Sequence, residues 1–379
     1  MNFDLSEEHL ALKQLVRDFA ESEVAPVAEQ LDEQAQFPYD LVKTMGLLGL
    51  TGLIFAKEYG GRGADILSFA IAIEELARVD SSMAITLAAD VSLGGGPINL
   101  FGTDGQKRKW LTPLALGEVL GSMGLTEPGA GSDAGATQTT AVLDGDEWVI
   151  NGSKEFITNS GTEMSGFVTI TAVTGEWDGR REISNIVVPR GTAGYSQAES
   201  YKKMGWHASD THELSFVDCR VPRENLLGER GHGFKQLLQV LDGGRISVAA
   251  IGLGLAQGCF EMALAFAKER TWAGQPLSRS QAVQFKLADM ATNVELARLM
   301  LYKAAVLQSQ GRPFVEEASM AKLFASEIAV KAADEAVGII GIESQNHPIN
   351  RFFRDAKILT IGEGTSEIQR MVLARFLGC

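Results

Sequence analysis

The hydrophobic pattern of this chain changes its period twice, and this change constrains the fold more than any single motif. Residues 1 to about 120 repeat apolar side chains at helical spacing. From about 121 to 228 the pattern becomes short β-branched runs separated by turns, and after Gly233 helical spacing returns and continues to Phe376. We therefore predict a mainly α-helical chain with a central β domain. The helical runs are 5–19, 47–53 and 71–76, the β runs are 167–171, 183–188 and 213–217, and the last region breaks at 274–276, 311–313 and 347–348.

One stretch, 246–267, is almost uncharged and is long enough to span a membrane. Gln257 and Glu261 interrupt it, and its small residues would let other helices pack closely. A helix that is apolar on all sides is usually buried in protein, so we interpret this stretch as the central helix of a soluble bundle. Gly252 and Gly254 hint at a dinucleotide-binding fingerprint. No strand precedes them and the third glycine comes one residue late, so we reject a Rossmann domain.

Composition sets the outer bounds of function. The chain has 379 residues, 45% of them apolar, which is enough for a large core and suggests more than one domain. The formal net charge of -14 argues against a general binder of nucleic acid or anionic membranes. Three scattered cysteines form no disulfide framework, and five histidines lack ligand spacing, so we predict a cytoplasmic protein with no metal site. Residues 1–8 are acidic where a signal or transit peptide would be basic, and we expect no cleavage there.

The segment 361–370 contains a Glu-Gly-Thr turn that opens the last predicted helix. Thr365 is a suitable N-cap, and Glu367 adds charge to the first turn, where backbone N–H groups favour an anion or a phosphate-bearing cofactor. Glu363 stands between Gly362 and Gly364, which allow a ligand to approach closely, so it is a candidate general base. A capped surface helix with a solvated Glu would show the same pattern, and this segment alone leaves both interpretations open.

Three further segments carry polar groups suited to a cofactor. The loop 125–133 combines hydroxyls with bare backbone N–H groups. The segment 152–159 follows a β-like run and places an aromatic ring beside a hydroxyl. Arg270 opens the segment 270–277, and with Gln281 it could clamp a diphosphate.

Those four segments, in this order and at these separations, resemble the acyl-CoA dehydrogenase family nearly end to end. The runs 203–211, 221–228 and 242–245 belong to the same resemblance. It implies an N-terminal α-helical domain over 1–120, a middle β-barrel-like domain over 121–230 and a C-terminal four-helix bundle over 231–379 that forms most contacts of a homotetramer. It also implies FAD as cofactor and the oxidation of a saturated acyl-CoA to the trans-2-enoyl-CoA, with electrons passed to an electron-transferring flavoprotein.

The resemblance assigns roles residue by residue. Glu363 matches the base that removes the α-proton while a hydride leaves the β-carbon for FAD N5, and its backbone N–H would bind the thioester oxygen. The position of the base in a minority of the family is Gly244 here. The implied FAD contacts are Leu125, Thr126, Ser132, Phe156, Ile157, Thr158, Arg270, Gln281, Gly338, Gly341, Thr365 and Glu367, and the implied substrate contacts are Ser132, Asp242, Arg245 and Gly364.

Within this set, Arg270 and Gln281 would come from a neighbouring subunit. Phe156 and Ile157 could instead be core of the β domain, and Arg245 could instead form a structural ion pair with Asp242.

The chain departs from the family at three places. The stretch 337–344 lacks the usual Gln and paired glycines and is about two residues shorter, Ala273 replaces an aromatic residue, and Gly362 replaces a Tyr, which widens the pocket beside the base. We expect a short to medium or branched acyl-CoA, and we expect Asp90, near the acyl end, to face solvent or a cap. An oxygen-using acyl-CoA oxidase and a flavin-free acyl-CoA-binding scaffold of the same fold remain as alternatives.

Overall fold

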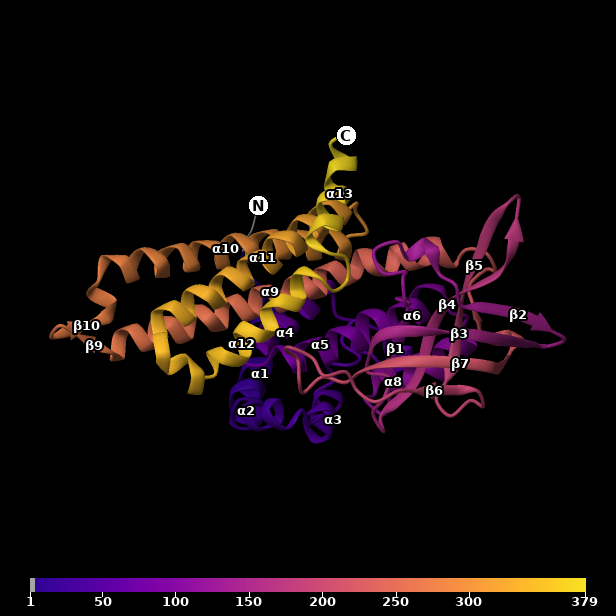
Figure 1. The fold of residues 1–379 in the computed structure, drawn as a ribbon, viewed down its shortest axis with the longest axis horizontal. Helices are drawn as coiled ribbons and strands as arrows, with labels where there is room; N and C mark the ends of the chain where they lie inside the picture. The colour runs from indigo at the N-terminus through magenta and orange to yellow at the C-terminus, as the bar shows by residue number, and fades with distance from the viewer. Residues whose placement is uncertain (1–3) are drawn as a thin grey trace.

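Helices make up both ends of the chain and strands its middle, as the sequence predicts (Figure 1). The computed structural model describes residues 4–379, so the first three residues of the predicted N-terminal domain lie outside the described residues. The β domain lies at one end of an elongated molecule, and the hairpin of β9 (Thr271–Trp272) and β10 (Gln275–Pro276) lies at the other (Figure 1). The three-part fold class is confirmed, whereas the predicted boundaries at 120/121 and 230/231 stay predictions.

The N-terminal helices begin where the sequence offers a capping side chain. Ser6 Oγ accepts from the backbone N–H of His9 at 3.2 Å at the start of α1, and Asp65 Oδ1 accepts from that of Ser68 at 2.8 Å at the start of α4. The predicted helical run 47–53 is wrong, because Gly49, at φ 68°, ends α3 in a left-handed turn.

The helices of this part are α1 (Glu7–Phe19), α2 (Ala25–Gln34), α3 (Tyr39–Leu47), α4 (Ile66–Ala77), α5 (Ser81–Ala88), α6 (Gly96–Phe101), α7 (Asp104–Gln106) and α8 (Thr112–Ala115). The π-helical segments are η1 (Ala20–Val24), η3 (Ala89–Gly95) and η4 (Lys107–Leu111), and η2 (Lys57–Tyr59) is a 3-10 turn.

The middle part is an eight-stranded sheet with the strand order β6-β7-β3-β2-β4-β5-β8, and β1 adds to it as a parallel partner of β4. The longest pairings, β3 with β7 and β4 with β5, are antiparallel. Inward residues such as Ile150, Val168 and Ile186 form a hydrophobic core separate from the larger helical core. The strands are β1 (Leu120–Gly124), β2 (Thr140–Asp144), β3 (Glu147–Thr158), β4 (Ser165–Trp177), β5 (Arg180–Pro189), β6 (Tyr195–Gln197), β7 (Thr211–Pro222) and β8 (Leu226–Leu227).

The long helix α9 (Gly233–Glu269) runs through the C-terminal part and contacts α4, α10 and α11. A Cβ added at Gly252 would lie 2.9 Å from the backbone of Ala325, and one at Gly254 would lie 2.2 Å from the carbonyl oxygen of Glu74, so these glycines permit the close packing. Among residues 4–379, α9 is the one helix long and apolar enough to cross a membrane, yet 67% of its apolar window is buried inside the protein. Its packing therefore matches the predicted central helix.

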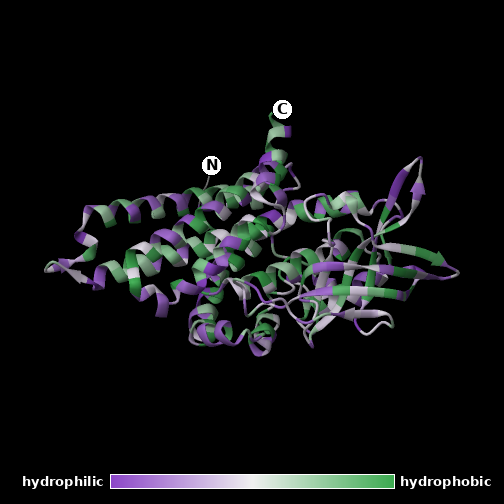
Figure 2. Ribbon diagram, in the orientation of Figure 1, coloured by the Kyte–Doolittle hydropathy of each residue, from purple (hydrophilic) through white to green (hydrophobic). Residues whose placement is uncertain are grey.

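The remaining elements complete the bundle. In Figure 2 hydrophobic residues are frequent where helices cross in the middle of the molecule, and hydrophilic ones are frequent on the hairpin that joins β4 to β5. These elements are β9 (Thr271–Trp272), β10 (Gln275–Pro276), α10 (Gln281–Ser309), α11 (Val315–Ile340), α12 (Ile349–Ala356) and α13 (Ser366–Phe376), with 3-10 turns η5 (Ala134–Ala136), η6 (Arg223–Asn225), η7 (Leu277–Arg279), η8 (Gly341–Asn346) and η9 (Lys357–Thr360).

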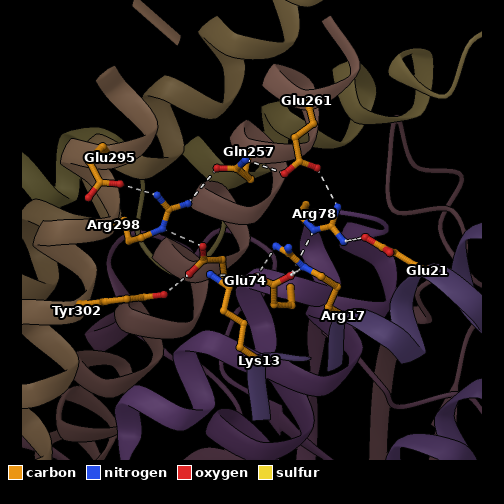
Figure 3. Close-up of polar contacts among 11 residues, drawn as sticks. Lys13, Arg17, Glu21, Glu74, Arg78, Gln257, Glu261, Glu295, Arg298 and Tyr302 are labelled. Carbon is orange, nitrogen blue, oxygen red and sulfur yellow. Dashed lines mark hydrogen bonds and ion pairs between the residues drawn. The ribbon is translucent and has the colours of Figure 1, made fainter. Parts of the chain in front are cut away.

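A cluster of two buried carboxylates and two partly buried arginines joins α4 to its neighbours, and we call Glu74, Glu75, Arg78 and Arg298 the charged joint (Figure 3). Glu74 accepts hydrogen bonds from Arg298 Nε at 3.1 Å and from the hydroxyl of Tyr302 at 2.8 Å. Glu75 lies against three cations, Lys13, Arg17 and Arg78. Each buried carboxylate of the joint is therefore paired with at least one cation, as burial of charge requires.

Candidate active site

The turn before α13 holds Glu363 in an uncommon backbone conformation. Glu363 has φ 50° and Gly364 has φ 93°, both in the left-handed region that non-glycine residues rarely adopt. Thr365 then caps α13, its hydroxyl accepting from the backbone N–H of Ile368 at 3.2 Å, which confirms the predicted N-cap. The cap and the glycine together let the chain turn sharply and direct the Glu363 side chain toward α9.

The carboxyl group of Glu363 is enclosed and unpaired. The residue as a whole is partly exposed, but both carboxyl oxygens are buried and have no hydrogen-bond partner in the part of the chain that the structure describes. Gly244 of α9 faces it, and a Cβ added there would lie 2.3 Å from Oε2. The carboxyl therefore needs glycine at 244, and a buried polar group without partners is costly unless a ligand supplies them.

The surroundings of Glu363 hold it near its protonation midpoint. Burial raises the pKa of Glu363 to about 7, although the nearby cations Lys322 and Arg245 both oppose the rise. A carboxyl with a pKa close to physiological pH can accept and release a proton there, as a general base must.

Arg245 lies on α9 one residue after Gly244 and forms the ion pair that the sequence left as an alternative. Its Nη1 donates to Asp242 Oδ1 at 2.6 Å and to the hydroxyl of Ser319 at 3.4 Å. Its Nε is buried and has no partner among residues 4–379. The pairing with Asp242 therefore leaves one donor of Arg245 free for a ligand.

The two predicted flavin segments of the β domain lie side by side. The carbonyl oxygen of Thr126, just past β1, accepts from the backbone N–H of Glu155 in β3 at 2.8 Å. Lys154, next to Glu155 in β3, stabilises this contact, because its buried Nζ donates to Glu127 Oε1 at 2.6 Å and to the carbonyl oxygen of Leu125 at 3.3 Å.

Electrostatics confirm that Lys154 and Glu127 act as a structural pair. Burial alone would raise the pKa of Glu127, but Lys154 and neighbouring donors hold it at about 2. Burial lowers the pKa of Lys154 to about 8 in spite of Glu127. Both groups are therefore mostly ionised near neutral pH, and their ion pair joins the two predicted cofactor segments.

Phe156 and Ile157 differ sharply in their surroundings. Phe156, at φ 59°, leaves 60% of its surface exposed and stacks on Tyr201 with ring centroids 4.9 Å apart. Its alternative role as core residue is wrong, because a core ring would be buried. Ile157 is buried in the β-domain core. Thr158 ends β3 half-buried, and Ser132 lies exposed in the loop after β1.

The predicted diphosphate residues lie far from this segment. Arg270 ends α9 beside the hairpin of β9 and β10, and Gln281 begins α10, at the end of the bundle opposite the β domain (Figure 1). Arg270 Nη2 pairs with Glu343 Oε1 at 2.9 Å, and Gly338 and Gly341 lie near the same end of α11. Within one chain, Arg270 and Gln281 lie far from Thr126 and Phe156. If all four residues contact the same FAD, Arg270 and Gln281 must come from a neighbouring subunit, as the sequence predicts.

The residues present fit a cofactor of the expected kind. A hollow of about 350 Å³ lies at the start of α13 and includes Thr365, Ser366 and Glu367, with Lys357 on its wall. The hydroxyl of Ser366 is buried and has no partner among residues 4–379. An exposed aromatic ring, and a hollow at a helix N-terminus with an unpaired hydroxyl, suit a flat ring with a phosphate-bearing tail.

Asp90 does not face solvent, so that expectation is wrong. It lies fully buried in η3, and its Oδ1 accepts from the backbone N–H of Gly121 at 2.8 Å. Burial raises the pKa of Asp90 well above its usual range, although the hydrogen bond from the Gly121 N–H opposes the rise. Burial therefore favours the neutral form of this carboxyl, which joins η3 to β1.

Comparison with known proteins agrees with this geometry. Models of the N-terminal, middle and C-terminal domains of acyl-CoA dehydrogenase match residues 6–118, 122–219 and 231–378. The chain belongs to the acyl-CoA dehydrogenase family. A relative in Bacillus subtilis (strain 168), named as a probable acyl-CoA dehydrogenase, is 51% identical over 100% of both chains.

Two solved structures are similar over the whole chain. Butyryl-CoA dehydrogenase from Megasphaera elsdenii is 42% identical with a TM-score of 0.97 and covers 100% of both chains. A chain in the structure titled for the electron transferring flavoprotein of Acidaminococcus fermentans is 45% identical with a TM-score of 0.97, covering 100% of this chain and 99% of that one. As a member of this family the protein is an FAD-dependent oxidoreductase.

Sequence reasoning missed two buried lysines of this acyl-CoA dehydrogenase. Lys154 lies inside the segment 152–159, and alternation along the strand gives no signal for its burial, because Gly152 and Phe156 on either side are exposed. Lys322 stands on α11 among buried alanines at helical spacing, where a charged residue is unexpected. In residues 4–379 no group of three or more His, Cys, Asp or Glu side chains is placed to hold a metal ion.

Proposed function

We propose that this enzyme oxidises short-chain acyl-CoA thioesters to trans-2-enoyl-CoA, with Glu363 as the base that removes the α-proton. The enclosed, unpaired carboxyl of Glu363 opposite Gly244 carries this proposal. Every other glutamate that is buried in residues 4–379 pairs with a cation, namely Glu74, Glu75 and Glu127. A carboxyl kept free of partners at this position is therefore available to the substrate.

In the proposed reaction the Glu363 carboxylate takes the proton from the α-carbon. The backbone N–H of Glu363 donates to the thioester oxygen and orients it. The protein encloses the Glu363 carboxyl and so excludes water from it, which protects the enolate-like transition state from bulk solvent. Bound FAD supplies the acceptor for the hydride that leaves the β-carbon. Arg245, with its free Nε, orients the substrate end that lies beside α9.

A short acyl chain is supported by the wall opposite Glu363. The hydroxyl of Ser247 on α9 donates to that of Ser92 on η3 at 3.3 Å, and a Cβ at Gly244 would lie 3.7 Å from Leu93 Cδ2. This close approach of η3 to α9 beside the base leaves little depth for a long tail. The similarity to butyryl-CoA dehydrogenase agrees with this reasoning.

The partners are part of the same proposal. An electron-transferring flavoprotein would accept the electrons, as the similarity to the Acidaminococcus fermentans chain suggests. A homotetramer would bring Arg270 and Gln281 of one subunit to the FAD held by Thr126, Phe156 and Thr158 of another. We place the enzyme in the cytoplasm.

An anaerobic absorbance experiment tests the proposed function. Butyryl-, isobutyryl-, hexanoyl- and octanoyl-CoA are added in turn to the FAD-loaded enzyme and to Glu363→Gln. We expect butyryl-CoA to bleach the flavin band in the wild type and no substrate to bleach it in the variant. A wild-type enzyme that holds FAD but is bleached by none of them, or best by octanoyl-CoA, would contradict the reaction or the chain length respectively.

A further inference from the structure

Lys322 is a fully buried cation that the reaction described above does not use. It lies on α11, packed against α13, and its Nζ donates to the carbonyl oxygen of Gly364 at 2.6 Å. Burying an ammonium costs several kcal/mol unless partners compensate. A single backbone carbonyl compensates this cost only weakly, so stability alone does not explain a lysine at this position.

The carbonyl that Lys322 holds belongs to the left-handed turn that aims Glu363. Gly364 has φ 93°, and the same carbonyl also accepts from Gln369 Nε2 at 3.2 Å. Two donors, one charged and one neutral, thus fix the residue that follows Glu363. The turn cannot rotate without breaking both bonds.

Lys322 also acts on Glu363 through its charge, although the two do not pair. Both oxygens of Glu363 lack a hydrogen-bond partner, whereas the ammonium is engaged by Gly364. Among the groups acting on Glu363, Lys322 lowers its pKa most, followed by Arg245, against the rise caused by burial. A direct ion pair would occupy the carboxyl, so the Gly364 carbonyl keeps the cation close and the carboxyl free.

We propose that Lys322 is a positioning residue for Glu363: its bond to the Gly364 carbonyl holds the turn, and its unpaired charge favours the ionised base. The inference rests on the proposed function, because it assigns Lys322 to the base of that reaction. It concerns residues of this chain alone, so it can be tested without turnover.

The other charged groups around the pair are few. Arg245 acts on Glu363 from α9 and is itself paired with Asp242. Glu367 on α13 acts on Lys322 from the solvent side, and Lys357 of η9 acts on Glu367. These groups stay in place when Lys322 alone is changed.

Two neutral variants separate the charge from the bond. Lys322→Met removes both, whereas Lys322→Gln keeps a donor for the Gly364 carbonyl and removes the charge. Gln369→Met is the matched control, because Gln369 contacts the same carbonyl without charge. Infrared difference spectra against Glu363→Gln, recorded on the FAD-loaded proteins from pH 5 to 9, follow the protonated carboxyl of Glu363.

We expect the Glu363 midpoint to move up by about one pH unit or more in Lys322→Met and Lys322→Gln, and to stay in Gln369→Met. The acid limb of flavin bleaching by butyryl-CoA moves in the same direction, so the rate at pH 6.5 falls about tenfold or more in both lysine variants. A purely structural lysine would lower the rate equally at all pH values. Glu363 midpoints in both lysine variants that coincide with the wild type would overturn the proposal.

Two further outcomes separate the role of Lys322 from the proposed function and from a failure to fold. If no acyl-CoA bleaches the wild type, the proposed function fails, and the infrared midpoints still decide the role of Lys322. If neither lysine variant folds, the reciprocal shift decides: ¹⁵N spectra of the lysine side chains must show a lower Lys322 pKa in Glu363→Gln, and an unchanged value would overturn the proposal.

Discussion

The charged joint and the Glu363 site use buried carboxyl groups in opposite ways. In the joint, Glu74 and Glu75 are enclosed by Arg298, Arg78 and other donors, so that their charge is compensated within the chain (Figure 3). At the turn before α13, Glu363 is enclosed as well, yet its oxygens have no partner in the described part of the chain. The same residue type is structural where the chain supplies its partners, and in the proposed reaction it is available to the substrate where the chain supplies none.

The largest expected effect is on the joint. Glu74→Leu should lower the free energy of unfolding by about 4 kcal/mol, because it leaves Nε of the half-buried Arg298 and the hydroxyl of Tyr302 without their buried carboxylate acceptor. Urea unfolding of the FAD-loaded enzyme measures this. Glu261→Ala is the control, since the Glu261 side chain is more exposed and Arg78 keeps Glu21 and Glu75 as partners without it; the loss should stay under about 1 kcal/mol. Equal losses would mean that burial of the pair is not what matters.

The Glu363 site should respond with the opposite sign. The folded pKa of Glu363 is raised to about 7 from an ordinary 4.5, so the favourable protonated state is complete below about pH 4.5 and is lost as pH rises through 7. Glu363→Gln does not ionise and should be more stable than the wild type at pH 8, by up to about 3 kcal/mol, with no difference in pH dependence left below pH 4.5.

Urea unfolding at pH 5 and at pH 8 measures this difference. Glu367→Gln serves as the control, because Glu367 is an exposed carboxylate of the same helix start whose pKa is lowered by its own backbone and by Thr365. Its stability relative to the wild type should not rise with pH. A Glu363→Gln variant that gains nothing between the two pH values would show that the carboxyl is compensated after all.

A smaller effect separates position from charge at the same site. Gly244→Ala places a Cβ 2.3 Å from the present position of Glu363 Oε2, which is closer than two such atoms can lie, so the carboxyl must shift. We expect the rate of flavin bleaching by butyryl-CoA to fall about 100-fold while the fold is kept. Gly243→Ala, whose Cβ would come no closer than 3.2 Å to the end of the Gln308 side chain, should stay close to the wild-type rate. Similar losses in both variants would point to the helix and not to the carboxyl.

The smallest effect concerns Asp90, which lies between the two cases. It is buried without a cation, but one oxygen accepts from Gly121. Because burial favours its neutral form, Asp90→Asn should change the free energy of unfolding by less than about 1 kcal/mol, whereas Asp90→Leu should cost about 1–3 kcal/mol by leaving the Gly121 N–H unpaired. Thermal unfolding at pH 7 distinguishes them, and a large loss in Asp90→Asn would show that the carboxyl is charged.

Much of the fold could be predicted because the signals are local. Apolar spacing placed α1, α4 and α9, and β-branched runs placed β4, β5 and β7. The run 47–53 failed because a single left-handed glycine, Gly49, outweighed apolar spacing. Thr365 as a cap could be read from three neighbouring residues.

The site could be predicted only in part, since its key contacts join distant segments. The resemblance pointed to Glu363, but no local pattern shows that Gly244 and Lys322 face it from two other helices. Asp90 was assigned to solvent or a cap because unpaired buried aspartates are rare, and its acceptor role depends on Gly121 in another element. Partners that are far apart in sequence are set by packing, which a local pattern does not contain.

The most direct test of Glu363 as the base is a single-turnover measurement with butyryl-CoA and its 2,2-dideuterated form under anaerobic conditions. We expect the wild-type flavin to bleach more slowly with the deuterated substrate, and we expect Glu363→Gln, loaded with the same amount of FAD, to bleach at least about 1,000-fold more slowly with either substrate. Bleaching in Glu363→Gln within tenfold of the wild-type rate would contradict the assignment of Glu363 as the base.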